Sequence, residues 1–313
     1  MDAYDPGLFT SLSHLWLSEP DAAAMARAQA LGVGTVAEPV ELAVAYADLL
    51  LLNVYPYGTV YTDGWGEINT PAAQRTAALF EAHGFAPPEL RAVGAPDHLG
   101  LCLGLLGQML AASNGTPTAG AAAEFLGETA FWAPVCCLAA ERDPSAHEFY
   151  RGVARVTREA MLGALCRWPA AGEALGVPNT DARLPPFAAE VGADEEVRLR
   201  DLVRFLLAPA RCGMFLSRAR FGRIARGLGM RLPFGSRFEV AEWLFSSAGQ
   251  NSLLPGLITA LRAEAVAAEG EYTRWAERWP LWRPAALYWI DRVRDMCSTL
   301  LSMESMAEHA GTG

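Results

Sequence analysis

The chain has 313 residues, of which 52% are hydrophobic and 19% charged, and its formal net charge is −10. All 25 basic residues are arginine, and lysine is absent. This absence excludes P-loop, protein-kinase and Schiff-base chemistry, each of which depends on an amine. The acidic balance argues against nonspecific binding to nucleic acids or membrane surfaces.

The N-terminus and the cysteines indicate a cytoplasmic protein. Residues 1–5 carry no basic region followed by an apolar stretch, so we expect no signal peptide. The most apolar stretch, residues 43–54, is short and contains Asp48, so we expect no membrane span. Six cysteines are scattered without CxxC spacing, which predicts reduced and buried thiols.

Apolar residues recur at helical spacing along most of the chain, and strand alternation bounded by hairpin signals is not found. Asp21, Thr70 and Ser145 each precede helix-forming sequence as candidate N-caps, and Pro71 occupies a favoured first position. We predict an all-α fold of about ten helices. Apolar stripes mark helices over residues 42–50, 149–160, 199–206 and 287–301.

Three prolines and several turn signals make residues 177–196 the best linker candidate. We therefore predict a helical bundle over residues 1–175, a linker over residues 176–197 and a C-terminal helical unit over residues 198–313. The tail is expected to form amphipathic helices that dock on the bundle. Its four tryptophans are Trp275, Trp279, Trp282 and Trp289.

Residues 32–37 match the GxGxxA dinucleotide fingerprint, which requires a preceding strand and a following helix. Here Asp21 to Leu31 is expected to be helix, so the glycines are more simply its C-terminal stop.

No catalytic or metal-binding constellation is found. The five histidines include no HExxH motif, and GxSxG is absent. Cys136 and Cys137 are adjacent, so on a helix they point about 100° apart and cannot chelate one metal together. We expect no enzyme activity, no metal and no cofactor.

Four large aromatics lie within residues 54–66, a segment that Pro56 and three glycines keep from being helical. Aromatics on a loop expose rigid apolar surface with a polar handle, which suits peptide recognition. The alternative, from residue type alone, is that these rings seal one end of the bundle.

A second feature is Gly94 to Leu101, where Asp97 occupies the position of a helix N-cap. His98 would then lie in the first turn, beside the positive end of the helix, which disfavours its protonation. The alternative is a simple cap followed by a packed histidine. A third feature is Pro134, which is expected to break or kink a helix and splay Trp132 outward.

The order of these features resembles the TorD/DmsD/NarJ family of cytoplasmic chaperones that mature molybdenum-cofactor oxidoreductases. The resemblance covers roughly residues 40–165 and implies an all-helical fold that binds the N-terminal leader, often twin-arginine, of a molybdoenzyme catalytic subunit. It also implies that export is delayed until the cofactor is inserted. The matching motifs are residues 56–63, residues 96–99, Trp132 and residues 147–151.

Carried over residue by residue, the resemblance implies a peptide-binding groove lined by Tyr57, Tyr61, Asp97, His98 and Trp132. The chain departs from the family pattern at Glu128, where a histidine is common, and at Cys102 and Gly104, where acids are usual. A carboxylate at Glu128 could pair with an incoming arginine. The client and any homodimerisation are left open.

Residues 211–231 contain six arginines and no acid. Arg220, Arg223 and Arg226 fall near one helical face, which favours an anion site for a phosphate or an acidic client surface. The alternative is a solvated face, or pairing with the acidic remainder of the chain.

The same region suggests an alternative function, a DNA-binding regulator with a helix-turn-helix over residues 217–247. Against it, the break between the helices is too long, and the second helix carries Glu239, Glu242 and Trp243 where cations belong.

Overall fold

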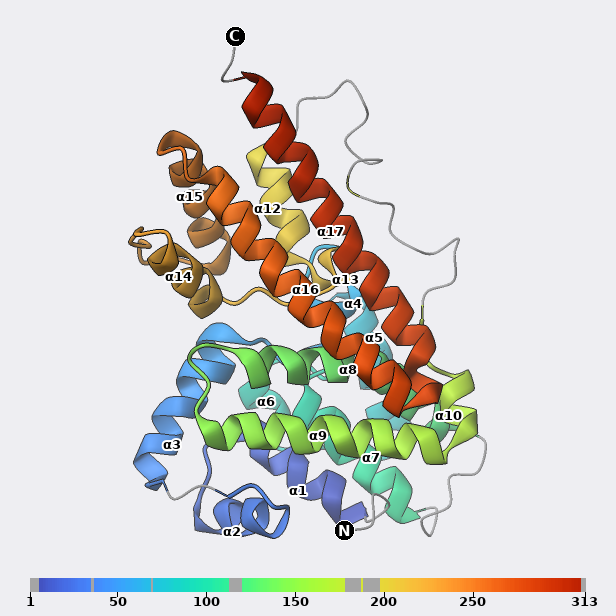
Figure 1. The fold of residues 1–313 in the computed structure, drawn as a ribbon. Helices are drawn as coiled ribbons and strands as arrows, with labels where there is room; N and C mark the ends of the chain where they lie inside the picture. The colour runs from blue at the N-terminus through green and yellow to red at the C-terminus, as the bar shows by residue number, and fades with distance from the viewer. Residues whose placement is uncertain are drawn as a thin grey trace.

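The computed structural model describes residues 6–34, 37–68, 70–112, 120–177, 187 and 198–310. Within these residues every regular element is helical, and extended segments meet only in an isolated bridge between Tyr57 and His98 (Figure 1). The all-α prediction is confirmed. The helices outnumber the ten that we expected, because several connections are themselves short helices.

The first part of the chain packs around two antiparallel pairs, α1 with α7 and α8 with α9. A π-helix, η1, continues α3 and leads into the aromatic segment. The elements are α1 (Pro6–Leu17), α2 (Ala22–Ala30), α3 (Pro39–Tyr46), η1 (Ala47–Asn53), α4 (Gly58–Thr62), α5 (Pro71–Ala82), α6 (Leu90–Val93), α7 (Leu99–Ala112), α8 (Ala121–Arg142), α9 (Glu148–Arg167) and α10 (Pro169–Glu173).

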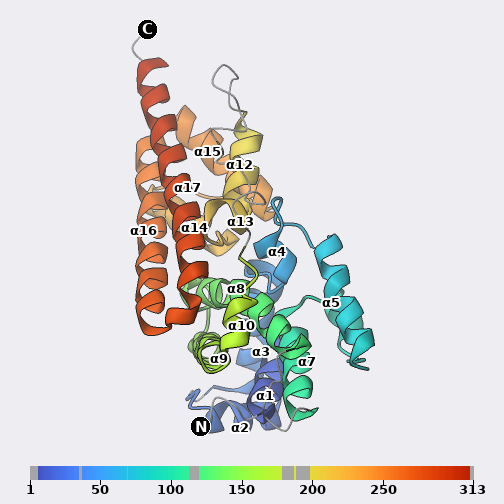
Figure 2. The same cartoon turned by 90° about the vertical axis from the view of Figure 1, so that its right-hand side faces the viewer.

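The second part is dominated by the long helices α16 and α17, which run side by side above the first part (Figures 1 and 2). The elements are α12 (Leu199–Leu207), α13 (Pro209–Cys212), α14 (Arg218–Gly227), α15 (Arg237–Gln250), α16 (Leu254–Arg278), the short 3₁₀ turn η3 (Pro280–Trp282) and α17 (Arg283–Ala310). Most of the predicted linker lies outside the described residues, so the proposed division stays a prediction.

The predicted helix ends have mixed outcomes. Asp21 is confirmed as a cap, since its Oδ1 accepts from the Ala24 amide at 2.7 Å. Gly32 is confirmed as the stop of α2, with a φ of +77° that glycine tolerates. Thr70 and Pro71 precede and begin α5, but the Thr70 side chain makes no capping hydrogen bond. The prediction that Ser145 caps the helix after it, α9, is wrong.

The cap of α9 is His147, whose Nδ1 accepts from the Phe149 amide at 3.1 Å. Ser145 instead binds Asp143, which accepts from both its amide and its hydroxyl. The turn before α9 is thus closed by Asp143, and the helix starts two residues later than Ser145 would place it.

Pro134 lies inside α8, and the helix continues through it. The proline has no N–H, so the Ala130 carbonyl loses its helical donor. The indole of Trp282 supplies a replacement, donating from Nε1 to the Ala130 oxygen at 2.7 Å. Trp289 donates to the next carbonyl, that of Phe131, at 3.0 Å. The second part of the chain therefore attaches to the first through the backbone of its interrupted helix.

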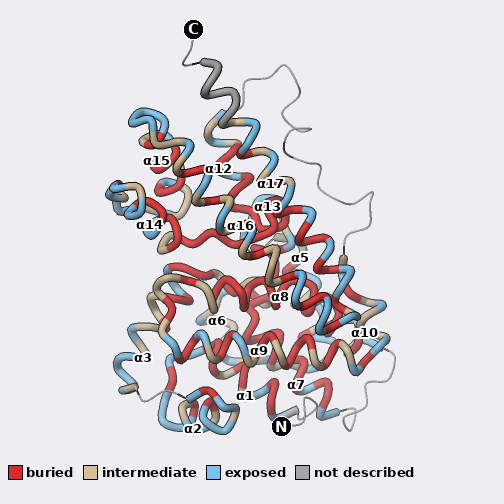
Figure 3. The backbone as a smooth tube through the Cα atoms, in the orientation of Figure 1, coloured by how far each residue is buried: buried red, intermediate tan, exposed pale blue. Residues whose placement is uncertain are grey.

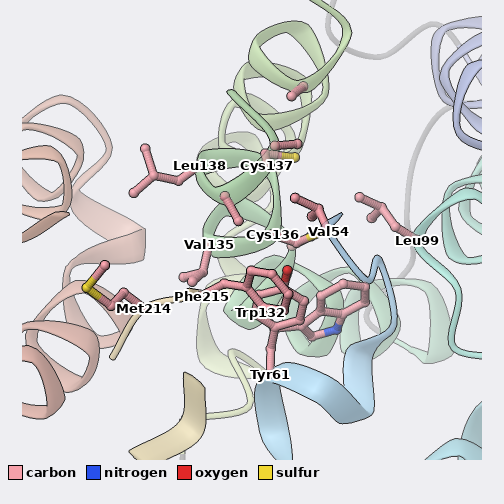
Figure 4. Packing of buried hydrophobic residues seen from close by; sticks show 14 of the residues in the cluster. Val54, Tyr61, Leu99, Trp132, Val135, Cys136, Cys137, Leu138, Met214 and Phe215 are labelled. Atoms are coloured by element: carbon pink, nitrogen blue, oxygen red, sulfur yellow. The ribbon is translucent and has the colours of Figure 1, made fainter. Parts of the chain in front are cut away.

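These contacts overturn the expectation that Pro134 splays Trp132 outward. Trp132 is buried and stacks on Tyr61, with ring centroids 5.9 Å apart and an interplanar angle of 21°. Figure 4 shows the two rings lying together, with Phe215 beside them. The four tail tryptophans are all buried, as the docking prediction requires. Buried residues are continuous across the junction of the two parts (Figure 3).

Candidate functional site

Backbone hydrogen bonds join the aromatic segment, residues 54–66, to the segment Gly94–Leu101. The amide of Leu99 donates to the Pro56 carbonyl at 2.7 Å, and the Gly58 amide donates to the Asp97 carbonyl at 3.0 Å. Tyr57 packs edge-on against His98, and its hydroxyl donates to the Val93 carbonyl at 2.7 Å. This short pairing holds the start of α4 against the start of α7.

The sequence predicted that Asp97 caps its own helix, α7, and this prediction is wrong. Its Oδ2 accepts from the Thr59 amide at 2.7 Å, and so it caps α4 instead. His98 is the residue before α7, and its Nδ1 accepts from the Gly100 amide at 3.1 Å. The cap thus lies one residue later than predicted, because the Asp97 carboxylate is drawn to a helix far away in the sequence.

A cavity of about 260 Å³ opens beside this junction. Its walls come from α4, α5, α7, α8 and α17, so both parts of the chain contribute. The lining residues are Gly58, Thr59, Thr62, Arg75, Thr76, Asp97, Cys102, Phe125, Glu128, Thr129, Phe131, Trp132, Gly176 and Tyr288. Three of the six residues predicted for peptide binding line this cavity, namely Asp97, Glu128 and Trp132.

The other three predicted residues support the cavity from behind. Tyr61 is fully buried under Trp132, and Tyr57 and His98 pack on each other. Gly58 lies against the Trp132 indole so closely that a Cβ there would meet the ring at 3.0 Å. Tyr61 and His98 are therefore core residues that fix the cavity wall, and Tyr57 is half-buried beside them. The alternative of sealing rings thus holds for part of the aromatic segment, since Trp65 is 61% exposed.

The buried part of the cavity carries acceptors that lack a donor. Asp97 is 4% exposed, and its Oδ1 has no hydrogen-bond partner. The Thr59 hydroxyl is likewise buried without a partner. Buried polar atoms in native proteins are almost always satisfied, so each exception calls for an explanation. Both residues line the cavity.

The rim of the cavity is charged and exposed. Glu128 and Thr62 are exposed on α8 and α4, and Arg75 is exposed on α5. Neither Glu128 nor Arg75 makes an ion pair with the described residues. One carboxylate and one guanidinium thus lie at the rim of a cavity whose interior holds a second, buried carboxylate, Asp97, and this acidic excess favours a cationic guest.

His98 is held neutral, in the direction that the sequence indicated but for a different main reason. Burial lowers its pKa from the ordinary 6.5 to about 3. An unfolded chain protonates this histidine below pH 6.5 while the folded chain does not. The stabilisation from His98 is therefore fully present above pH 6.5 and is lost as the pH falls towards 3.

We expect this loss to disappear in a His98→Asn variant, whose side chain can still accept from the Gly100 amide. Between pH 6.5 and pH 4, the wild type should lose about 1.4 kcal/mol of unfolding free energy per pH unit relative to the variant. Urea unfolding at each pH measures the difference in unfolding free energy. The contributions of the other four histidines cancel because both proteins contain them. Parallel pH profiles for the two proteins would contradict this role of His98.

The arginine cluster is largely paired within the chain. Arg220 is 5% exposed and forms an ion pair with Glu264, and it also donates to the Arg142 carbonyl at 2.6 Å. Arg223 binds the other oxygen of Glu264. An anion at this face would have to displace Glu264, so the geometry favours the pairing alternative for these two arginines. Arg226 is exposed on the same helix.

The helix-turn-helix alternative gains nothing from the structure. Nine residues, 228–236, separate α14 from α15. Helix α15 packs against α12 and α16, with Glu239 exposed and Glu242 in an ion pair with Arg200 of α12. A recognition helix needs cations on its outer face.

Eleven of the fourteen lining residues were not among the predicted site residues, and Thr59, Arg75 and Tyr288 are the most informative of them. Thr59 lies in the aromatic segment, and Arg75 lies in the helix that was predicted from Thr70 and Pro71. Neither residue was predicted to bind a ligand. Tyr288 lies in α17, far along the chain from the motif region, and no local pattern links it to Asp97. The tryptophan-rich tail was the one available signal that α17 docks on the bundle.

Other site classes lack support within the described residues. No group of three or more His, Cys, Asp or Glu side chains gathers there to hold a metal. The six cysteines are free thiols, of which Cys166 and Cys297 are half-buried and the rest buried. In the part of the chain that the structure describes, no helix has the length and apolarity needed to cross a membrane.

Comparison with known proteins gives one match. Residues 18–137 match the model of the family described as nitrate reductase delta subunit. This is a family of molybdoenzyme maturation chaperones of NarJ/TorD type. The resemblance expected from the sequence is thereby confirmed over these residues, which include Asp97, Glu128 and Trp132 but not Tyr288. No curated protein and no solved structure matches the chain.

Proposed function

We propose that this chain is a cytoplasmic maturation chaperone, not an enzyme, for a molybdenum-cofactor oxidoreductase. It binds the N-terminal leader of the catalytic subunit, commonly a twin-arginine leader, and holds the subunit for cofactor insertion before export. The family match over residues 18–137 supports the chaperone class. The cavity beside Asp97 supports the peptide-binding part of the proposal.

The observation that carries the proposal is the unpaired Oδ1 of the buried Asp97. An arginine side chain reaching this carboxylate would form a charge-assisted hydrogen bond, which is among the stronger kinds. Ligand pockets for drug-sized molecules have volumes of roughly 300–1,000 Å³. A cavity of about 260 Å³ therefore suits one inserted side chain better than a larger ligand.

The rest of the leader would lie across the rim. Arg75 and the threonines provide donors for backbone carbonyls of an extended segment, and Trp132 with Tyr288 provides an apolar wall. Glu128 would pair with a second cation at the opening. Affinity then comes from the apolar wall and the buried acid, while the exposed acid selects the basic leader.

Calorimetry against the leader peptide of a candidate client, the catalytic subunit of a molybdopterin oxidoreductase from the same organism, tests the proposal. We expect saturable binding by the folded protein, with affinity that falls as salt rises. A folded protein that binds neither the leader nor the apo-subunit would refute the proposed function.

The Glu128→Gln variant tests the role of the rim. An exposed ion pair contributes about 0.2–1 kcal/mol, so we expect a loss of affinity of up to about 5-fold and a weaker salt dependence. Glu124→Gln is the matched control, because Glu124 is exposed one turn earlier on α8 and does not line the cavity. Equal behaviour of the two variants would remove Glu128 from the site.

A further inference from the structure

The loop between α14 and α15 exposes an aromatic side chain among arginines. Phe234 is 96% exposed, and the Arg218 guanidinium lies 5.4 Å from its ring centroid. Arg218 also donates to the Gly235 carbonyl at 3.4 Å, which holds the loop to α14. Arg226 and Arg231 are exposed nearby and make no ion pair with the described residues.

The loop itself contains no acid, and the first acid after it, Glu239 in α15, is already engaged. Glu239 binds the Ser236 amide in a capping box at the start of α15, and this hydrogen bond lowers its pKa. The cluster formed by Phe234, Arg218, Arg226 and Arg231, here called the basic end, is therefore a positive, aromatic patch on a chain of net charge −10. Aromatic residues and arginine are the types enriched at protein interfaces.

The exposed side of α3 and η1 carries negative charge, opposite to that of the basic end. Leu42, Tyr46 and Asn53 face the core, while four large apolar side chains point outward: Val40, Val44, Leu51 and Leu52. Glu38 and Glu41 accompany them at the start of α3. Glu41 has a side chain 59% exposed, and one of its oxygens lies 3.5 Å from the Nε2 of His147. This acidic, apolar row is here called the acidic end.

The two ends belong to one side of the molecule. Asn53, the last residue of η1, accepts at 2.8 Å from the Ala219 amide next to Arg218. In Figure 1 helix α3 lies directly below α14 on the left-hand side. Together the ends hold five of the ten large hydrophobic side chains that are exposed among the described residues. An exposed apolar concentration of this kind marks an interaction surface.

We propose that this surface is the contact between two copies of the chain related by a two-fold axis. A surface that is acidic at one end and basic at the other is complementary to itself when rotated by 180°. The basic end of one copy then faces the acidic end of its partner, and Phe234 anchors among Val40 and Val44. None of these residues lines the peptide cavity, so the contact is independent of leader binding.

Light scattering of the purified protein over about 1–300 µM tests the proposal, since this range covers weak and moderate dimers. We expect the mass to rise to twice the 33.6 kDa of one chain. Phe234→Asp should weaken dimerisation at least 10-fold. Val266→Asp is the control, because Val266 is 65% exposed on α16 and belongs to neither end.

A charge exchange tests the register of the contact. Arg231→Glu and Glu41→Arg should each weaken the dimer, and the double variant should restore it. Circular dichroism of each variant reports whether the helices persist. A wild type that stays monomeric, a dimer that survives Phe234→Asp, or a double variant as monomeric as the single ones would overturn the proposal.

Discussion

Replacing Trp282 with alanine is expected to lower the free energy of unfolding by about 3–5 kcal/mol, the usual cost of truncating a buried tryptophan. Trp282 is fully buried, and its indole donates to the carbonyl that Pro134 leaves unpaired. The variant therefore loses both packing and the donor that completes α8. Urea unfolding followed by circular dichroism measures the loss.

The Trp282→Phe variant isolates the hydrogen bond. Leaving the Ala130 carbonyl buried and unpaired should cost about 1–3 kcal/mol. In a Pro134→Ala background the restored amide can bond to Ala130, so the same substitution should cost clearly less. Trp279→Phe is the control, because Trp279 is buried without such a bond. Strict additivity of Trp282→Phe and Pro134→Ala would contradict the proposed coupling.

Replacing Asp97 with asparagine is expected to weaken leader binding about 10- to 150-fold, since a hydrogen bond to a charged group contributes about 1.5–3 kcal/mol. Asparagine still offers an oxygen to the Thr59 amide, so α4 keeps its cap. The thermal midpoint should therefore change little while affinity falls.

Asp143→Asn is the matched control for this substitution. Asp143 is also a buried acid with one unpaired oxygen, and its other oxygen binds Ser145, but it lies outside the cavity. Leader affinity should be unaffected by it. An equal loss of affinity in both variants would indicate a general effect of buried charge rather than a site at Asp97.

Local rules predicted the helices and several of their ends. Helical spacing, the Asp21 cap and the Gly32 stop depend on neighbours within one turn, so they can be read from the chain. The same rules misplaced the caps at Asp97 and Ser145. In both cases a nearby histidine nitrogen caps the helix, and the acid or hydroxyl serves a different turn.

Contacts between residues far apart in the chain could not be predicted from the sequence. The expectation that Pro134 breaks or kinks α8 and turns Trp132 outward was wrong. The helix continues because Trp282 and Trp289, far along the chain, donate to the carbonyls beside the proline. Intramolecular pairing of Arg220 was foreseen as an alternative, but its partner Glu264 could not be identified. Resemblance to a family predicted one site for Asp97 and Trp132, and Glu128 was added to it at a departure from the family pattern. All three line the cavity.

The central claim is that a leader arginine reaches the Asp97 carboxylate. Calorimetry of wild type and Asp97→Asn, each with the native leader and with a leader whose arginines are replaced by glutamine, tests it directly. The proposal predicts that Asp97→Asn weakens the native leader at least 10-fold and leaves the glutamine leader nearly unchanged. An equal loss with both peptides would contradict it.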